Sequence, residues 1–82
     1  MELISTPLEK NYLIKFKSFN DDRGSFSRAF CEDTFKKNNL ETNYKQCNTS
    51  KTHFAGTLRG LHYQKDPFSE IKLIRCLNGS LF

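Results

Sequence analysis

Short segments in which apolar and polar residues alternate, separated by turn residues, constrain the fold of this chain most strongly. The segment Ser25 to Phe30 alternates at every position, with Phe26, Arg28 and Phe30 on one face. This two-residue period is typical of a half-exposed β-strand. The preceding segment, Asn20 to Gly24, is a strong turn signal, because Asn and Asp side chains bond to the backbone and Gly adopts positive φ. We therefore expect a mainly β fold.

Five further segments have the composition of strands or strand-like arms. The first ends near Pro7, which suits an edge strand or a peripheral arm, and the last leads into Asn78-Gly79, a preferred two-residue hairpin turn. The five segments are Leu3–Leu8, Tyr12–Phe19, Tyr44–Ser50, Thr57–Gln64 and Glu70–Leu77. One short helix is expected over Glu32–Leu40, since it has acids in its first turn, lysines toward its end and Asn38-Asn39 as a stop.

The chain length predicts one small domain covering residues 1–82. A chain of this size buries about 60% of its unfolded surface, so its stability is marginal. Only Ser80 to Phe82 follow the turn at Asn78-Gly79, which leaves the last expected hairpin with one strand. An unpaired edge of this kind is poor architecture, and we therefore expect a truncated domain.

Composition and charge narrow the classes of partner. The 13 Lys and Arg against 9 Asp and Glu give a net charge of +4, which favours anionic ligands. The three cysteines are odd in number and form no C-x-x-C pair, so reduced thiols in the cytosol are expected rather than a zinc ribbon or a redox dithiol. The apolar runs are too short to cross a membrane.

The segment Leu58 to Gln64 contains the first candidate site residues. Simple alternation would place Arg59 and His62 on opposite faces. A glycine inside a strand often marks a bulge or a close approach, and a bulge at Gly60 would let the two side chains converge. An arginine can bind a diphosphate through two donors, and a histidine can transfer protons near neutral pH. The alternative is an exposed arginine and a hydrogen-bonded core histidine.

The other candidates are also basic or polar side chains. Lys72 shares a strand face with Ile74 and Cys76, where it could stabilise a developing oxyanion or simply extend its ammonium group to solvent. Gln46 and Asn48 could contact a base edge or a sugar hydroxyl, or face solvent. Arg23 lies in the Asp-Asp-Arg-Gly turn, where it could bind a ligand or cap the neighbouring acids.

Taken in order, five segments resemble the dTDP-4-dehydrorhamnose 3,5-epimerase family. The most specific is Arg59-Gly60-Leu61-His62-Tyr63-Gln64 within Gly56–Gln64. The other four are Leu3–Leu8, Asp21–Phe26, Gln46–Ser50 and Lys72–Cys76. The resemblance covers nearly all of the chain and implies the N-terminal portion of a cupin-like jelly roll, an antiparallel β-sandwich.

The resemblance also implies a function for the candidate residues. The family inverts carbons next to the C4 ketone of a dTDP-4-keto-6-deoxy sugar through enolate intermediates, without a metal or organic cofactor, in a homodimer joined by the N-terminal strand. His62 would be the general base and Lys72 would stabilise the enolate oxygen. The substrate would be bound by the remaining four candidates, Arg23, Gln46, Asn48 and Arg59.

Two departures from the family pattern carry expectations of their own. Arg28 stands where members commonly have a glutamate between two phenylalanines, which predicts a changed preference for base or sugar or a divergent branch. The family's later half, with the acid tyrosine and the aspartate that orients the histidine, is not in this sequence. We therefore expect part of a substrate site and little or no turnover by this chain alone.

Two hypotheses from other classes remain beside the epimerase. One is a non-catalytic β module for subunit assembly or anionic-ligand binding, which would pair through its exposed strand edges. The other is a basic β domain that stacks single-stranded nucleic acid on Tyr and Phe. This second hypothesis ranks last, because the epimerase segments already account for the arginines and aromatics. We expect neither a nucleic-acid nor a membrane partner.

Overall fold

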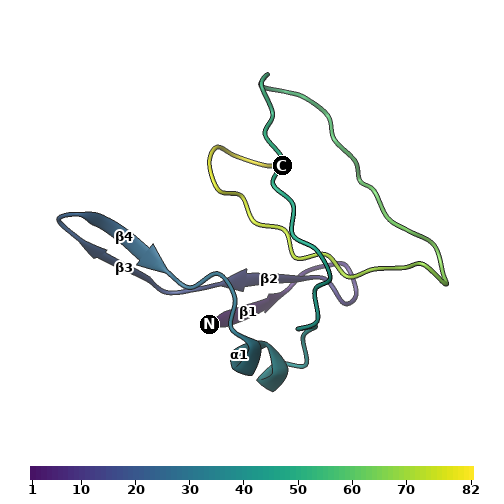
Figure 1. The fold of residues 1–82 in the computed structure, drawn as a ribbon, viewed down its shortest axis with the longest axis horizontal. Coiled ribbons are helices and arrows are strands. Elements are labelled where there is room, and N and C mark those ends of the chain that lie inside the picture. Colours follow the sequence, from purple (N-terminus) through teal and green to yellow (C-terminus); the bar gives the residue numbers. More distant parts are fainter. The chain divides into compact units, whose positions relative to one another are not determined.

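A computed structural model describes all of residues 1–82 and is mainly β, with two small antiparallel sheets and one short helix (Figure 1). In chain order the elements are β1 (Glu2–Ser5), β2 (Tyr12–Lys15), β3 (Ser18–Asp21), β4 (Gly24–Ser27) and α1 (Glu32–Lys37). The first sheet pairs β1 with β2, and the second pairs β3 with β4. The prediction of a mainly β chain with one helix is confirmed.

The first hairpin, β1–β2, places apolar residues opposite one another. Leu3 lies opposite Ile14, and Ile4 lies opposite Leu13. Thr6 stabilises the connection, since its hydroxyl accepts a hydrogen bond from the Leu8 amide at 3.2 Å and donates one to the Asn11 carbonyl at 2.9 Å. The expected strand at Leu3–Leu8 therefore exists but ends at Ser5, before Pro7.

The second hairpin, β3–β4, forms around the predicted turn. The Asp21 carboxylate accepts a hydrogen bond from the Arg23 amide at 2.9 Å, and Gly24 has a φ of 139°. The expected strand at Tyr12–Phe19 is split into β2 and β3, with a break at Phe16 and Lys17. The split arises because the two halves pair with different neighbours, β1 and β4.

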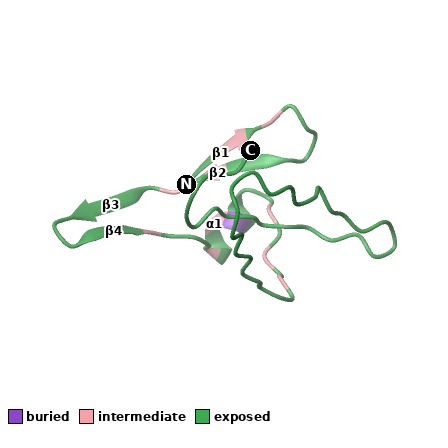
Figure 2. Ribbon diagram, turned by 90° about the horizontal axis from the view of Figure 1, so that it is seen from above, coloured by how far each residue is buried: buried purple, intermediate pink, exposed green.

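The one buried residue of the molecule is Phe35 in α1. The buried part of the ribbon lies at this helix (Figure 2). The Phe30 ring meets Phe35 edge-on, with ring centroids 4.8 Å apart, and the Phe16 ring stacks on it with centroids 6.4 Å apart. Tyr44 packs edge-on against Phe30 at 6.1 Å. Burial raises the pKa of Tyr44, and the charge of Glu41 adds to this. These four rings form a small aromatic core.

The ends of α1 match the sequence signals. Lys36 pairs with Glu32 one turn earlier at 2.6 Å, which fits the expected order of acids before lysines. Asn38 caps the C-terminus, and Asn39 has a φ of 57°, a conformation that cannot continue a helix. The helix therefore stops at Lys37, before the expected end at Leu40.

Residue contacts divide the chain into two units, Met1–Lys45 and Gln46–Phe82. The second unit contains no helix or strand. The strands expected at Tyr44–Ser50, Thr57–Gln64 and Glu70–Leu77 are therefore wrong as strands. The physical reason is pairing, since a strand needs a neighbour for its backbone N–H and C=O groups and these segments have none.

Local turn geometry is nevertheless present in the second unit. The Thr57 amide donates to the Phe54 carbonyl at 3.4 Å around Ala55-Gly56, and Gly56 has a φ of 77°. Near the end of the chain, Asn78 and Gly79 form a bend, and Gly79 has a φ of 87°. Asn78-Gly79 therefore bends the chain, but the hairpin predicted there does not form, because no strand flanks the bend.

Candidate functional site

Arg59 is held by the segment on the other side of the Ala55-Gly56 turn. Its Nε donates to the Thr52 hydroxyl at 2.9 Å, and its Nη2 donates to the Lys51 carbonyl at 3.2 Å. The turn itself is closed by Thr57, whose hydroxyl donates to the Phe54 carbonyl at 2.7 Å. The arginine predicted to bind diphosphate is thus exposed and held at one edge of its guanidinium group.

The two residues predicted to carry catalysis, His62 and Lys72, lie together. The Lys72 Nζ donates to the His62 backbone carbonyl at 2.9 Å, and Glu70 lies 3.6 Å from the same nitrogen. The side chains of Lys72 and Glu70 are less than half exposed, at 41% and 43%. The ammonium group therefore lies beside the backbone of the histidine, with one acid as its counter-ion.

Gly60 allows the His62 ring to lie close to the backbone. Gly60 has a φ of 77°, and a Cβ atom built there would lie 3.2 Å from the imidazole Nδ1 and 3.1 Å from the His62 amide nitrogen. The backbone at Gly60 therefore lies close to the imidazole, but residues 57–64 form no strand, so the bulge that was expected to bring Arg59 and His62 together is absent. His62 itself is exposed, which excludes the alternative of a core histidine.

Gln46 and Asn48 both lie in the second unit, outside any helix or strand, and both are exposed. Their amide groups make no hydrogen bond with the rest of the chain, so their donors and acceptors are open to a ligand or to water.

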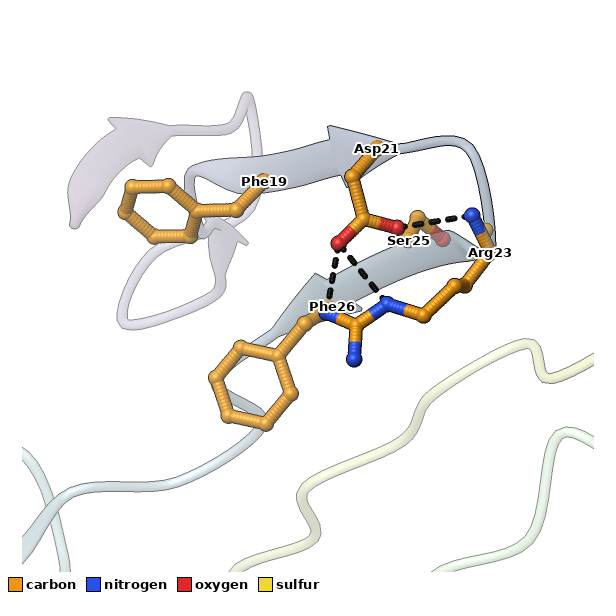
Figure 3. A pocket seen from close by; sticks show the side chains of 6 residues that line it. Phe19, Asp21, Arg23, Ser25 and Phe26 are labelled. Carbon is orange, nitrogen blue, oxygen red and sulfur yellow. Dashed lines mark hydrogen bonds and ion pairs between the residues drawn. The ribbon is translucent and has the colours of Figure 1, made fainter.

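Arg23, in the first unit, lies at the turn of the β3–β4 hairpin beside a shallow hollow of about 220 Å³ (Figure 3). Its guanidinium group pairs with the Asp21 carboxylate at 2.6 Å, and this ion pair, together with the Arg23 amide, holds the pKa of Asp21 below its usual range. The hollow is lined by Phe19, Asp21, Arg23, Gly24, Ser25 and Phe26. Arg23 thus pairs with a neighbouring acid, which was the alternative to ligand binding, and it also lines the hollow.

Two exposed rings complete the hollow. Phe19 lies opposite Phe26 across the hairpin, and the two rings lie on the face toward which Asp21 and Arg23 point (Figure 3). They are 58% and 73% exposed, and the Lys17 Nζ lies 5.1 Å from the centre of the Phe19 ring. A flat aromatic surface next to a guanidinium group can stack a planar ring and contact an anion.

Arg28, the residue that departs from the family pattern, is exposed and follows β4 directly. It lies close enough to Cys31 for its charge to act on that thiol. The Thr34 hydroxyl and amide hold the pKa of the Cys31 thiol below its usual range, and Arg28 adds a smaller effect in the same direction. The positive charge of Arg28 therefore acts on the thiol of Cys31, the residue that precedes α1.

The second unit brings together two pairs of groups, Lys72 with the His62 backbone and Arg59 with the 51–52 segment. Three neighbours of the predicted residues were missed by sequence reasoning, although each had a signal. Thr52 mirrors Arg59 across the turn, Glu70 is two residues from Lys72, and Phe19 mirrors Phe26 across the first predicted turn. The signals of Thr52 and Phe19 depend on the correct turn centre, whereas that of Glu70 depends only on its spacing from Lys72.

Nowhere in the chain do three or more His, Cys, Asp or Glu side chains gather as metal ligands would. No helix combines the length and apolar character needed to cross a bilayer.

The geometry defines a mainly β chain with one short helix, whose candidate site residues lie at a hairpin turn and in segments without regular structure. Comparison with known proteins makes the assignment specific. Residues 5–82 match the family model described as dTDP-4-dehydrorhamnose 3,5-epimerase, and the chain belongs to this family.

Several curated relatives carry that name. The one from Sinorhizobium fredii is 46% identical over 70 residues, which is 85% of this chain and 36% of the relative. The relatives from Shigella flexneri and Escherichia coli are 36% and 32% identical over 83 residues, which cover all of this chain and 45% and 44% of theirs. The chain thus spans less than half the length of these relatives. No solved structure gives a significant match.

Proposed function

We propose that this chain carries the general base, the enolate-stabilising cation and part of the nucleotide-binding surface of a dTDP-4-dehydrorhamnose 3,5-epimerase. The substrate is a dTDP-4-keto-6-deoxy sugar. His62 removes a proton next to the C4 ketone, and Lys72 stabilises the negative charge that develops on the ketone oxygen. Arg59 and Arg23 bind the diphosphate, and Gln46 and Asn48 contact the nucleotide.

The observation that carries the proposal is the 2.9 Å hydrogen bond from the Lys72 ammonium group to the His62 backbone carbonyl. A proton next to a ketone is far too weakly acidic for an imidazole of pKa about 6.5 to remove unaided. A cation fixed close to the base lowers the energy of the enolate that forms, which is the largest contribution such a site can make. A base and a cation in one neighbourhood therefore support proton abstraction beside a carbonyl.

The surroundings of His62 indicate how far the reaction can go on this chain alone. The imidazole makes no hydrogen bond or ion pair in the structure, and the Glu70 carboxylate pairs with Lys72. Without a carboxylate to fix its tautomer, a catalytic histidine loses orders of magnitude in rate. We therefore propose that this chain binds the nucleotide but turns over little or no substrate.

Binding is tested by NMR titration of the chain with dTDP, with thymidine as the matched control that lacks phosphate. We expect dTDP to shift the amide resonances of Arg59 and His62 and thymidine to shift them much less. Arg59→Gln should weaken dTDP binding about tenfold, because a bidentate contact to phosphate is lost. Equal binding of dTDP and thymidine would count against a diphosphate site.

Turnover is tested by incubating the chain with the 4-keto-6-deoxy sugar nucleotide in deuterated water and following C3 and C5. We expect no measurable exchange. Exchange that disappears in His62→Ala would show that the chain is active alone, and would refute the proposed lack of turnover while supporting the role of His62. Exchange that persists in His62→Ala would refute the assignment of the base.

We also propose a domain organisation, an oligomeric state and a cellular compartment for the chain. We infer that residues 1–82 form parts of one family domain, since the family match runs without interruption from residue 5 to residue 82. A homodimer through the β1–β2 hairpin is supported by its half-exposed apolar residues, among them Leu13 at 52% exposure. Three free cysteines support a reducing compartment, the cytoplasm.

A further inference from the structure

The turn at Ala55-Gly56 brings the side chain of Arg59 back to the segment that precedes the turn. Phe54 and Thr57 close the turn, and Gly56 has the positive φ of about +80° that position i+2 of a type II turn requires. Counting outward from this pair, Thr52 falls opposite Arg59. The hydrogen bond between their side chains is therefore a cross-turn contact built by the turn geometry.

The guanidinium group of Arg59 has five N–H donors arranged along two edges. The contacts to Thr52 and Lys51 occupy Nε and one N–H of Nη2, which together form the side edge. Three donors remain, two on Nη1 and one on Nη2. The two nitrogens that carry them form the end edge, whose spacing matches two oxygens of a phosphate group.

We propose that Thr52 is a positioning residue for ligand binding, which fixes Arg59 so that the end edge of its guanidinium group is presented to the diphosphate of the nucleotide. This inference rests on the proposed function, since it takes the ligand of Arg59 to be a diphosphate. Thr52 itself touches no ligand and acts through Arg59. The Lys51 carbonyl assists as a second acceptor on the side edge.

The energetic reason is preorganisation. A free arginine side chain has many rotamers, and binding an anion requires most of them to be given up. An exposed arginine held at its side edge has already lost much of that freedom. The ligand then binds to a fixed pair of donors. The free energy of binding is more favourable because less side-chain conformational entropy is lost on binding.

The first test needs no ligand and follows the Nε–H resonance of Arg59 by NMR. In the wild type we expect slowed hydrogen exchange at this group compared with Arg28. Thr52→Val keeps the shape of the side chain but removes the hydroxyl, and should abolish the protection, whereas Thr52→Ser should retain it. Equal exchange in wild type and Thr52→Val would overturn the positioning role.

The second test measures dTDP affinity in a double-mutant cycle. Thr52→Val should weaken dTDP binding about fivefold, the scale of one typical net hydrogen bond, and Thr52→Ser should restore it. In an Arg59→Lys background, where no forked group remains to be positioned, Thr52→Val should change affinity by less than about twofold. Thr49→Val, at an exposed threonine of the same unit whose hydroxyl contacts nothing, should leave binding unchanged.

The outcomes separate this inference from the proposed function. If Arg59→Gln weakens dTDP binding while Thr52→Val does not, the positioning role is wrong and the proposed function stands. If dTDP does not bind the wild type, the proposed function is wrong for this chain, and the diphosphate as the ligand of Arg59 fails with it. An equal effect of Thr52→Val in the wild-type and Arg59→Lys backgrounds would show that Thr52 acts on the fold rather than through Arg59.

Discussion

The ion pair between Asp21 and Arg23 joins two residues of one turn. Both groups are largely exposed, with side chains 53% and 91% accessible, so the pair contributes little to global stability. Its effect is local, since it sets the direction of the Arg23 side chain beside the Phe19–Phe26 hollow. A ligand that binds Arg23 through its guanidinium group must compete with this carboxylate.

The first prediction concerns the titration of Asp21. Its pKa is held down mainly by the side chain of Arg23, so Arg23→Gln should raise it toward the ordinary value of about 3.9. The local stabilisation from a lowered carboxyl pKa is present above about pH 4 and is lost as pH falls through the folded-state pKa. NMR titration of the side-chain carboxyl carbon measures this, and Arg28→Gln, which removes the same charge outside the turn, should leave it unchanged. An unchanged titration in Arg23→Gln would contradict the ion pair.

The second prediction concerns Gly60. Gly60→Ala should cost roughly 1 kcal/mol in local conformational free energy, because alanine is strained at positive φ. The new Cβ would also crowd the imidazole Nδ1 at 3.2 Å and displace the His62 ring. The ring resonances of His62 should therefore shift, while those of His53 serve as an internal reference.

Gly56→Ala is the matched control for Gly60→Ala. Gly56 has the same φ of 77°, but a Cβ there meets nothing within 4 Å. It should therefore show the backbone strain without the shift of the His62 ring. Equal His62 shifts in the two variants would mean that the contact with the ring has no effect of its own.

At the scale of elements, α1 and the two hairpins depend on different interactions. The hairpins are held by backbone pairing over four residues each, whereas α1 is six residues long and too short to be stable alone. It is held by the rings of Phe16 and Phe30 against Phe35. The stability of α1 therefore depends on the packing of the aromatic core.

The third prediction follows from this dependence. Phe35→Ala should lower the free energy of unfolding by about 3 kcal/mol, in the range for a fully buried phenylalanine, and remove most of the helical signal. Urea unfolding followed by circular dichroism measures both. The matched control is Phe26→Ala, at a ring 73% exposed, which should change stability by less than about 1 kcal/mol. Similar losses in the two variants would refute a core centred on Phe35.

At the scale of the whole molecule, most large apolar side chains are exposed and one residue is buried. Exposed apolar groups in such number favour association with another protein surface. In the second unit Leu58, Leu61 and Ile74 are 89%, 98% and 73% exposed. These apolar side chains are therefore suited to packing against another protein surface.

The fourth prediction tests the proposed homodimer. Leu13→Glu places a charge on the apolar face of the β1–β2 hairpin and should weaken self-association at least about tenfold, because the charge would have to be desolvated. Sedimentation equilibrium over a range of concentrations measures this. Asn11→Glu adds the same charge in the loop between the strands and should have little effect. A wild type that remains monomeric at all concentrations would refute the homodimer.

Sequence reasoning identified those parts of the fold and site that depend on neighbouring residues. The turn at Asp22-Arg23, the charge order of α1 and its stop at Asn38-Asn39 all follow from groups a few residues apart. The close approach at Gly60 belongs to the same class. The motif around Arg59 and His62 also pointed to the family, which the match over residues 5–82 confirms.

Only the tertiary structure decided which segments pair with which. It split Tyr12–Phe19 between two sheets, left residues 46–82 without strands, and joined Thr52 to Arg59 and Lys72 to the His62 carbonyl. The physical reason is that a helix or a turn satisfies its backbone within a few residues, whereas a strand or a cross-turn contact depends on atoms distant in the chain. Alternation shows that a segment is suited to a sheet, and only a partner strand makes it part of one.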